Sequence, residues 1–319
     1  MEKLLEVKDL KVSFFTDLGE TQAVKDAGFA IEEGDFFGIV GESGSGKSVT
    51  TKSILRLGPS NCRIMGGEIL FQGEDILKKS EAELREIRGG EIAMIFQDSL
   101  SALNPVYTVG NKMVELIRRH TSMTKKEAKA RVLELLTAVG ITDPEKAMRS
   151  YPHELSGGMS QRVMIAMAMS SNPKVLIADE PTTALDVTIQ AQILHLLLEL
   201  QKKNNMSIIL ITHDLGVVAQ TCKRVAVMCG GYVVEEGTVE EIFLNPGHPY
   251  TQALIASMPR VGGTFEQFLE RDLSDGSGNL CPFLNRCKYA DKTCEACLPK
   301  YYESSENHKI LCHRREEEK

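Results

Sequence analysis

The sequence has no long hydrophobic run. No stretch approaches the 18 or so consecutive apolar residues that a membrane-spanning helix needs. Its first residues, MEKLLEV, also lack the apolar core of a secretory signal peptide. We therefore expect a chain that crosses no bilayer and stays in the cytoplasm.

An excess of basic residues is missing too. The chain has 37 Lys and Arg against 44 Asp and Glu, and its formal net charge is −7. A protein that coats nucleic acid needs a basic face to meet the phosphates, so this charge argues against that class. We find no internal repeat, and 319 residues are more than one hydrophobic core usually organises. Two domains, or one domain with an extension, are expected.

Short apolar runs are present and predict an α/β fold. Residues 1–35 alternate apolar and polar side chains around glycine turns, which is typical of a small antiparallel sheet. Helices are expected over about residues 109–171, with a capping box at Thr124 and Glu127, and another helix begins at Asp186. Nearly continuous apolar runs, typical of strands covered on both faces, occur at residues 36–40, 92–96, 175–179 and 207–212.

A glycine-rich loop follows the first of these runs. Residues 41–48, GESGSGKS, fit G-x-x-x-x-G-K-[ST], the pattern of a loop whose backbone N–H groups surround nucleotide phosphates. Lys47 can reach the β- and γ-phosphates, and the hydroxyl of Ser48 can ligate Mg²⁺. A strand before the loop and a helix after it are the context that the motif requires. The residues that we predict to bind nucleotide here are Gly41, Glu42, Ser43, Gly44, Ser45, Gly46, Lys47, Ser48 and Val49.

Polar side chains end three of the later apolar runs. Asp179 can hold Mg²⁺, and Glu180 beside it can activate or orient the water that attacks the γ-phosphate. Gln97 could contact that water or the metal, and His213 could reach the γ-phosphate. A single Gln or His at a strand end is more often structural, so the fixed order of these elements carries the prediction.

A second candidate anion site lies far along the chain. Residues 155–161, LSGGMSQ, open a predicted helix with Ser156, Gly157 and Gly158. The N–H groups at a helix N-terminus attract anions, so this segment is suited to a phosphate. By itself, Ser-Gly-Gly is only a loop pattern.

Together these elements resemble the ATP-binding-cassette (ABC) family over about residues 1–237. The Ser-Gly-Gly segment is similar to the signature sequence of that family, and residues 184–186, which end in Asp186, are similar to its D-loop. Gln97 and His213 match the Q-loop glutamine and the switch histidine of the family.

This resemblance implies a fold and a dimer. The fold is that of a P-loop NTPase of the α/β class, with an antiparallel β subdomain and an α-helical subdomain at about residues 98–171. Phe14 lies where the family places an aromatic ring that stacks on adenine, although Phe15 beside it leaves that choice open. Two cassettes would hold ATP between the phosphate loop of one and Ser156 of the other.

The C-terminal part of the sequence resembles one group within this family. Residues 245–251, NPGHPYT, resemble the His-Pro-Tyr segment of ATPases that serve oligopeptide, dipeptide and nickel importers. Residues 96–105, FQDSLSALNP, are similar to the same group, except that Ser99 replaces its usual proline. We therefore interpret residues 238–319 as a C-terminal extension of the oligopeptide-transporter type.

Five of the eight cysteines lie in this extension. Four thiolates can hold a [4Fe–4S] cluster or a zinc ion, and the spacing is not that of two paired C-x₂-C zinc units. It resembles a ferredoxin-like motif at the C-terminus of peptide-importer ATPases, and Cys297 departs from that motif and could compete as a ligand. The match implies as cluster ligands Cys281, Cys287, Cys294 and Cys312. Unliganded thiols are the third alternative.

The function implied is that of an ATP-hydrolysing subunit of an importer for oligopeptides or dipeptides, at the cytoplasmic face of the cell membrane. Its implied partners are two transmembrane permease subunits, a second ABC ATPase subunit and an extracytoplasmic solute-binding protein, with no nucleic acid. Nickel, opine and oligosaccharide importers use the same type of ATPase. A soluble ABC ATPase acting on DNA or ribosomes usually has tandem cassettes or a coiled-coil insertion, which this sequence lacks. A purely regulatory nucleotide-binding module would not need Glu180 and His213.

Overall fold

The computed structural model describes residues 3–98, 102–183, 185–258, 280–305 and 308–315. Ser99 and residue 184 of the D-loop, both named above, lie outside these residues. The chain forms two compact units. The first comprises Met1–Glu32, Phe36–Leu77 and Thr212–Lys319, and the second comprises Glu33–Asp35 and Lys78–Ile211.

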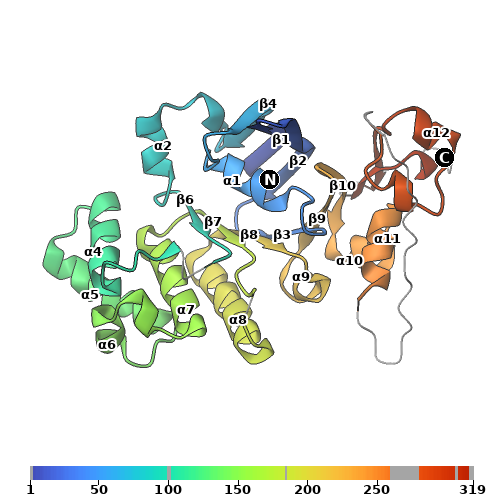
Figure 1. Cartoon of the computed structure of the whole chain (residues 1–319). Coiled ribbons are helices and arrows are strands. Elements are labelled where there is room, and N and C mark those ends of the chain that lie inside the picture. Colours follow the sequence, from blue (N-terminus) through green and yellow to red (C-terminus); the bar gives the residue numbers. More distant parts are fainter. Residues whose placement is uncertain (1–2, 99–101, 184, 259–279, 306–307, 316–319) are drawn as a thin grey trace. The chain divides into compact units, whose positions relative to one another are not determined.

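The first unit is built on a sheet in which the strands run in the order β5-β4-β1-β2-β10-β9-β3. Strand β1 pairs antiparallel with β2 and with β4, which confirms the predicted antiparallel sheet, whereas β3 pairs in parallel with β9 (Figure 1). The strands are β1 (Lys3–Thr16), β2 (Gly19–Glu32), β3 (Phe36–Val40), β4 (Cys62–Phe71), β5 (Glu74–Asp75), β9 (Arg224–Cys229) and β10 (Tyr232–Thr238).

Helices and a C-terminal hairpin complete this unit. The hairpin extends the sheet, because its second strand pairs antiparallel with β10. The helices are α1 (Lys47–Ile54), α9 (Leu215–Thr221), α10 (Val239–Leu244), α11 (Pro249–Ala256) and α12 (Lys292–Ala296), and the hairpin strands are β11 (Tyr301–Ser305) and β12 (His308–Leu311). The chain beyond residue 237 is thus more regular than its sequence indicates. The domain boundary at residues 237 and 238 stays a prediction.

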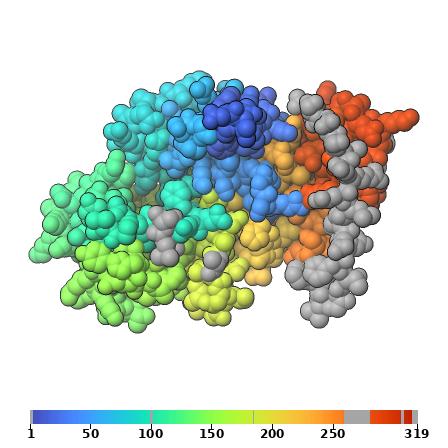
Figure 2. Space-filling view, viewed as in Figure 1, coloured from blue at the N-terminus to red at the C-terminus, as the bar shows by residue number. Residues whose placement is uncertain are grey.

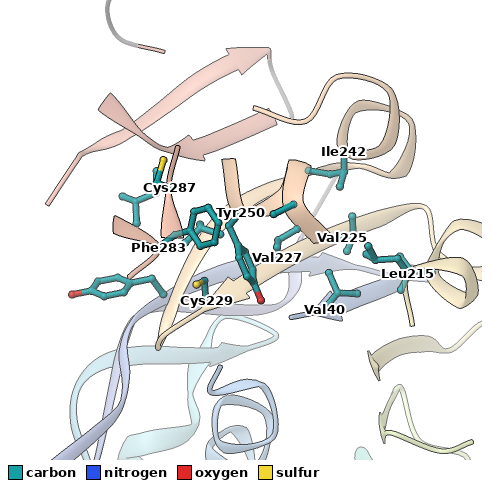
Figure 3. Packing of buried hydrophobic residues seen from close by; sticks show 14 residues of the cluster. Val40, Leu215, Val225, Val227, Cys229, Ile242, Tyr250, Phe283 and Cys287 are labelled. Atoms are coloured by element: carbon teal, nitrogen blue, oxygen red, sulfur yellow. The ribbon is translucent and has the colours of Figure 1, made fainter. Parts of the chain in front are cut away.

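One hydrophobic cluster of the first unit joins β3 to the C-terminal segments. Val40 at the end of β3 belongs to the same cluster as Tyr250 of α11 and as Phe283 and Cys287 of the cysteine-rich segment (Figure 3). Each of these side chains is buried. The strand that leads into the glycine-rich loop therefore shares its core with residues more than 200 positions later in the sequence.

The second unit combines a parallel sheet with helices. Strand β7 lies between β6 and β8, parallel to both, as expected of strands that are apolar along their whole length. The strands are β6 (Ile92–Ile95), β7 (Val175–Asp179) and β8 (Ser207–Thr212), whose last residue is counted with the first unit. All four apolar runs form strands, and only the run at residues 92–96 ends one residue early.

The helices of the second unit confirm the helical segment predicted at about residues 109–171. Helices α4, α5 and α6 contact one another and form one body, green in Figure 2. The hydroxyl of Thr124 accepts a hydrogen bond from the N–H of Glu127, and the carboxylate of Glu127 accepts one from the N–H of Thr124. The predicted capping box is therefore present. The helices are α2 (Glu81–Ile87), α4 (Val109–His120), α5 (Lys125–Ala138), α6 (Pro144–Arg149), α7 (Gly157–Ala168) and α8 (Val187–Asn204). Short 3₁₀ turns occupy Ile76–Lys78, Pro152–Glu154, Met169–Ser171, Leu284–Arg286 and His313–Arg315. In the part of the chain that the structure describes, no helix is both long enough and apolar enough to cross a bilayer.

Candidate nucleotide-binding and cysteine sites

The glycine-rich loop connects β3 to α1, as predicted. Lys47 is only 5% exposed, and its Nζ atom donates hydrogen bonds to the carbonyl oxygens of Gly41 and Glu42 at 2.7 and 2.8 Å. Gly46 caps α1 without a side-chain hydrogen bond, and the N-terminus of a helix attracts anions. A lysine at the centre of such a loop is suited to phosphate.

Two of the loop glycines are required by packing as well as by backbone geometry. Gly41 has a φ of +152°, and a Cβ atom there would lie 2.2 Å from the carbonyl oxygen of Met228. At Gly46, with a φ of +102°, a Cβ would lie 2.8 Å from the carbonyl oxygen of Ala23. Gly44 has a φ of +79° but no atom within 4 Å of the Cβ position. The first and third glycines are thus enclosed, and the second is open.

Two carboxylates lie at the end of β7 in the second unit, Asp179 as its last residue and Glu180 directly after it. Asp179 is fully buried at the end of the strand. Glu180 adopts a left-handed φ of +47°, which is unusual for a residue with a Cβ atom and is typical of functional sites. One of its carboxylate oxygens accepts hydrogen bonds from Gln97 Nε2 and from Thr183 Oγ1, each at 2.9 Å. The structure therefore brings together two of the three predicted catalytic side chains, Gln97 and Glu180.

The third predicted catalytic residue, His213, lies in the first unit and is exposed just after β8. The candidate adenine contact, Phe14, is half-buried in β1 of the same unit. The face of the neighbouring Phe15 is covered by the guanidinium of Arg63, 5.1 Å from the ring centroid. Of the two candidate rings, Phe14 and Phe15, the ring of Phe15 therefore already stacks against Arg63.

The Ser-Gly-Gly segment begins α7 in the second unit. Ser156 is the N-cap residue and accepts a hydrogen bond from the N–H of Met159 at 3.3 Å. Ser156 and Gly157 are exposed, and a Cβ atom at Gly158 would lie 3.1 Å from the side chain of Ile189. Ile189 in turn donates its N–H to Asp186, the exposed N-cap of α8. The signature-like and D-loop-like residues therefore meet on one exposed surface.

The four cysteines predicted as ligands line one cavity of about 20 Å³, together with His248. Burial raises the pKa of Cys281 to about 12 and also raises the pKa of Cys294 and of Cys312. A cavity of this size holds about one water molecule. Within the described residues, no three His, Cys, Asp or Glu side chains are placed to hold a metal ion as they stand. The four cysteines predicted as cluster ligands are gathered, but the described residues form no metal site.

A contact between the C-terminal region and the phosphate loop was not predicted. The hydroxyl of Tyr250 accepts a hydrogen bond from the N–H of Glu42 at 2.8 Å, and the carboxylate of Glu42 binds the guanidinium of Arg286. His248 is 1% exposed and caps α11 by accepting the N–H of Tyr250. No local pattern in the sequence could reveal these contacts, because the partners lie more than 200 residues apart.

The chain matches two protein families. Residues 24–183 match the family "ABC transporter", and residues 234–294 match "Oligopeptide/dipeptide transporter, C-terminal region". The oligopeptide transport ATP-binding protein OppD of Bacillus subtilis (strain 168) is 56% identical over 268 residues, which cover 84% of this chain and 75% of OppD. The dipeptide transport ATP-binding protein DppD of the same organism is 48% identical over 319 residues, covering 98% of this chain and 95% of DppD.

The chain belongs to the ABC transporter ATP-binding proteins of the oligopeptide and dipeptide group. By this membership it is an ATPase, with ATP and Mg²⁺ as the expected ligands. Among solved structures, the ATP-binding cassette MJ0796, a dimer in a post-hydrolysis state bound to ADP and phosphate, superposes with a TM-score of 0.67 at 29% identity. That match covers 74% of this chain and 98% of MJ0796.

Proposed function

We propose that this chain binds and hydrolyses ATP to drive the uptake of oligopeptides or dipeptides through separate permease subunits. The observation that carries the proposal is the phosphate loop, in which the buried Lys47 at the start of α1 donates hydrogen bonds to the carbonyl oxygens of Gly41 and Glu42. The peptide substrate is supported by the names of OppD and DppD and by the match of residues 234–294.

The side chains have distinct proposed roles in hydrolysis. Glu180 orients or activates the attacking water, and the amide of Gln97, hydrogen-bonded to it, positions its carboxylate. His213 contacts the γ-phosphate, and Phe14 stacks on the adenine. The hydroxyl of Ser48 and the carboxylate of Asp179 are oxygen donors of the kind that Mg²⁺ prefers, and the ion would neutralise charge on the phosphates.

The proposed assembly contains two ATPase subunits under two transmembrane permease subunits, with an extracytoplasmic protein that delivers the solute. The exposed surface around Ser156, Gly157 and Asp186 is the part of the second unit that we assign to a partner cassette. The helical segment at residues 98–171 is assigned to the permease. The subunit would then work at the cytoplasmic face of the membrane.

We also propose that the four cavity cysteines hold a [4Fe–4S] cluster, with zinc as the alternative. Thiolates are the ligands of both, and four thiols that line one cavity are the donor set a cluster requires. Since the cavity is small and burial raises the pKa of the Cys281 thiol, loading would release protons and move the cysteine loops apart. Anaerobically purified protein should therefore show visible absorption and stoichiometric iron. Colourless protein that contains only zinc would reject the cluster.

The transport proposal can be tested in cells that carry the gene. Uptake of a labelled dipeptide, a labelled oligopeptide and Ni²⁺ would be compared with the gene intact, deleted, and replaced by the Glu180→Gln variant. We expect peptide uptake to disappear in the deletion and to stay absent with the variant, while Ni²⁺ uptake is unchanged. Loss of Ni²⁺ uptake alone would favour the nickel importer instead.

A further inference from the structure

Glu42, the second residue of the phosphate loop, is held by the C-terminal region at three points. Its backbone N–H donates to the hydroxyl of Tyr250 at 2.8 Å. Its two carboxylate oxygens accept hydrogen bonds from the two terminal nitrogens of Arg286 at 2.9 and 2.7 Å. A planar guanidinium that binds both oxygens of a carboxylate fixes orientation as well as distance. An otherwise exposed loop residue is thereby fixed on both its backbone and its side chain.

Arg286 is itself rigidly placed. Its guanidinium lies over the ring of Phe283, 5.1 Å from the centroid, and over the ring of Tyr250, 5.9 Å away. It is the last residue of the 3₁₀ turn Leu284–Arg286. In this turn the backbone N–H of Leu284 donates to the carbonyl oxygen of Cys281, and the N–H of Arg286 donates to that of Phe283.

Tyr250 is anchored with equal firmness. It is 1% exposed and packs edge-on against Phe283, with ring centroids 5.4 Å apart (Figure 3). Burial raises the pKa of Tyr250, so the hydroxyl stays neutral, and its oxygen accepts the hydrogen bond from the loop. Tyr250, Phe283 and Val40, which immediately precedes the loop, belong to the same hydrophobic cluster.

The anchored residue also touches the phosphate-binding lysine. The carbonyl oxygen of Glu42 accepts a hydrogen bond from Lys47 Nζ at 2.8 Å. The peptide groups on both sides of the Glu42 Cα atom are therefore engaged, one by Tyr250 and one by Lys47. A displacement of Glu42 would change where Lys47 rests when no nucleotide is bound, and would change the shape of the loop that receives the phosphates.

We propose that Arg286 and Tyr250 are positioning residues for nucleotide binding, which preorganise the phosphate loop through Glu42. They touch no reacting atom and act through the loop alone. Because Arg286 lies between Cys281 and Cys287 in a short hydrogen-bonded turn, the same contact ties the wall of the cysteine cavity to the nucleotide site. This inference rests on the proposed ATP-binding function.

The test is a double-mutant cycle on nucleotide affinity in the full-length protein. The variants are Arg286→Gln, Glu42→Gln and the double variant, each titrated with a non-hydrolysable ATP analogue and Mg²⁺. We expect each single variant to weaken binding about 5- to 10-fold, and the double variant to be no weaker than the single ones, because the two side chains act as one pair. Arg286→Lys keeps the charge but not the two-pronged contact, so it should recover only part of the affinity.

Tyr250→Phe isolates the second anchor, since it removes one hydroxyl and leaves the packing of the ring. It should weaken binding about 3- to 5-fold, as expected for one lost hydrogen bond. The matched control is Tyr301→Phe, which removes a hydroxyl bonded to the carbonyl oxygen of Val233 in the same unit. Arg131→Gln, which breaks an ion pair with Glu134 in the second unit, is the control for arginine. Both controls should bind as tightly as the unmodified protein.

The outcomes separate this inference from the function on which it rests. If the unmodified protein binds no nucleotide, the proposed function fails and the inference fails with it. If it binds nucleotide and the Arg286 and Tyr250 variants bind equally well, the function stands and the positioning role is overturned. Equal weakening in the control variants, or purely additive effects in the cycle, would also overturn it, since general destabilisation would then account for the loss.

Discussion

The phosphate loop and the signature-like segment are both glycine-containing turns before a helix, but they are held very differently. The loop is enclosed by its own unit: Gly41 and Gly46 leave no room for a Cβ atom, and Lys47 is buried. Ser156 and Gly157, by contrast, are exposed, and the cap of Ser156 is a single bond within its own helix. The first turn is enclosed within its own unit, whereas the second is an exposed surface, which we propose is completed by a partner cassette.

The largest effect is expected from a substitution that disrupts the enclosed phosphate loop. Gly41→Ala would place a Cβ atom 2.2 Å from a backbone oxygen at a φ of +152°, where neither the new residue nor its neighbour can adapt. We expect the free energy of unfolding to fall by about 3 kcal/mol or more, with loss of nucleotide binding. Denaturant unfolding and a nucleotide titration would measure both.

Gly44→Ala is the matched control for that variant. Its φ of +79° also disfavours alanine, but nothing lies within 4 Å of the new atom, so only about 1 kcal/mol should be lost. Equal losses at the two positions would show that backbone strain, and not enclosure, is the reason for the glycines.

The next effect concerns chemistry in the second unit. Glu180→Gln keeps the size of the side chain and an oxygen that can accept from Gln97, but it removes the carboxylate charge. Phosphate release should fall about 100- to 1000-fold while ATP affinity is retained. Glu199→Gln, on an exposed part of α8, should leave both unchanged. Undiminished phosphate release from Glu180→Gln would refute the proposed role.

A smaller effect is expected from Lys47→Ala, and it should appear in a single chain. Removing this ammonium deletes charge-assisted contacts with the phosphates, so ATP affinity should fall about 100-fold, or close to 3 kcal/mol. The exposed Lys126 of α5 offers the control, because Lys126→Ala removes a positive charge of the same kind without touching the loop. A nucleotide titration at low protein concentration measures the difference, and an unaltered affinity would contradict a self-sufficient loop.

The smallest effect is expected in the signature-like segment. Ser156→Ala should cost about 1 kcal/mol of stability through the lost helix cap and should leave single-chain nucleotide affinity unchanged. Hydrolysis by paired cassettes should nevertheless fall about 10-fold, if the serine contacts the ATP of its partner. Thr124→Ala, which removes the cap of α5, should cost similar stability without that loss of hydrolysis. If the two variants behave alike, the serine is only a helix cap.

The features that were predictable are those encoded within a few neighbouring residues. Continuous apolar runs identified the strands, because a strand covered on both faces must be apolar at every position. The capping box at Thr124 and the N-cap Asp186 marked helix starts through contacts three residues long. The order of motifs then indicated the family, which the comparisons confirm.

The features that were missed leave no local pattern in the sequence. The hairpin β11–β12 is short and mostly polar, so it lacks the alternation that would predict strands. The bonds that Glu42 forms with Arg286 and Tyr250 span 244 and 208 residues. Any other glutamate, arginine or tyrosine in the sequence would give the same local pattern.

The sequence by itself therefore determined the kind of chemistry. A glycine spacing typical of a phosphate-binding loop, and carboxylates that end an apolar strand, need no knowledge of the fold to be recognised. The tertiary structure alone decided what supports that chemistry, namely the hydrogen bond between Gln97 and Glu180 and the anchoring of Glu42. The physical reason is that a side-chain contact is set by where the folded backbone places its two ends, and such placement leaves no periodic or local trace in the chain.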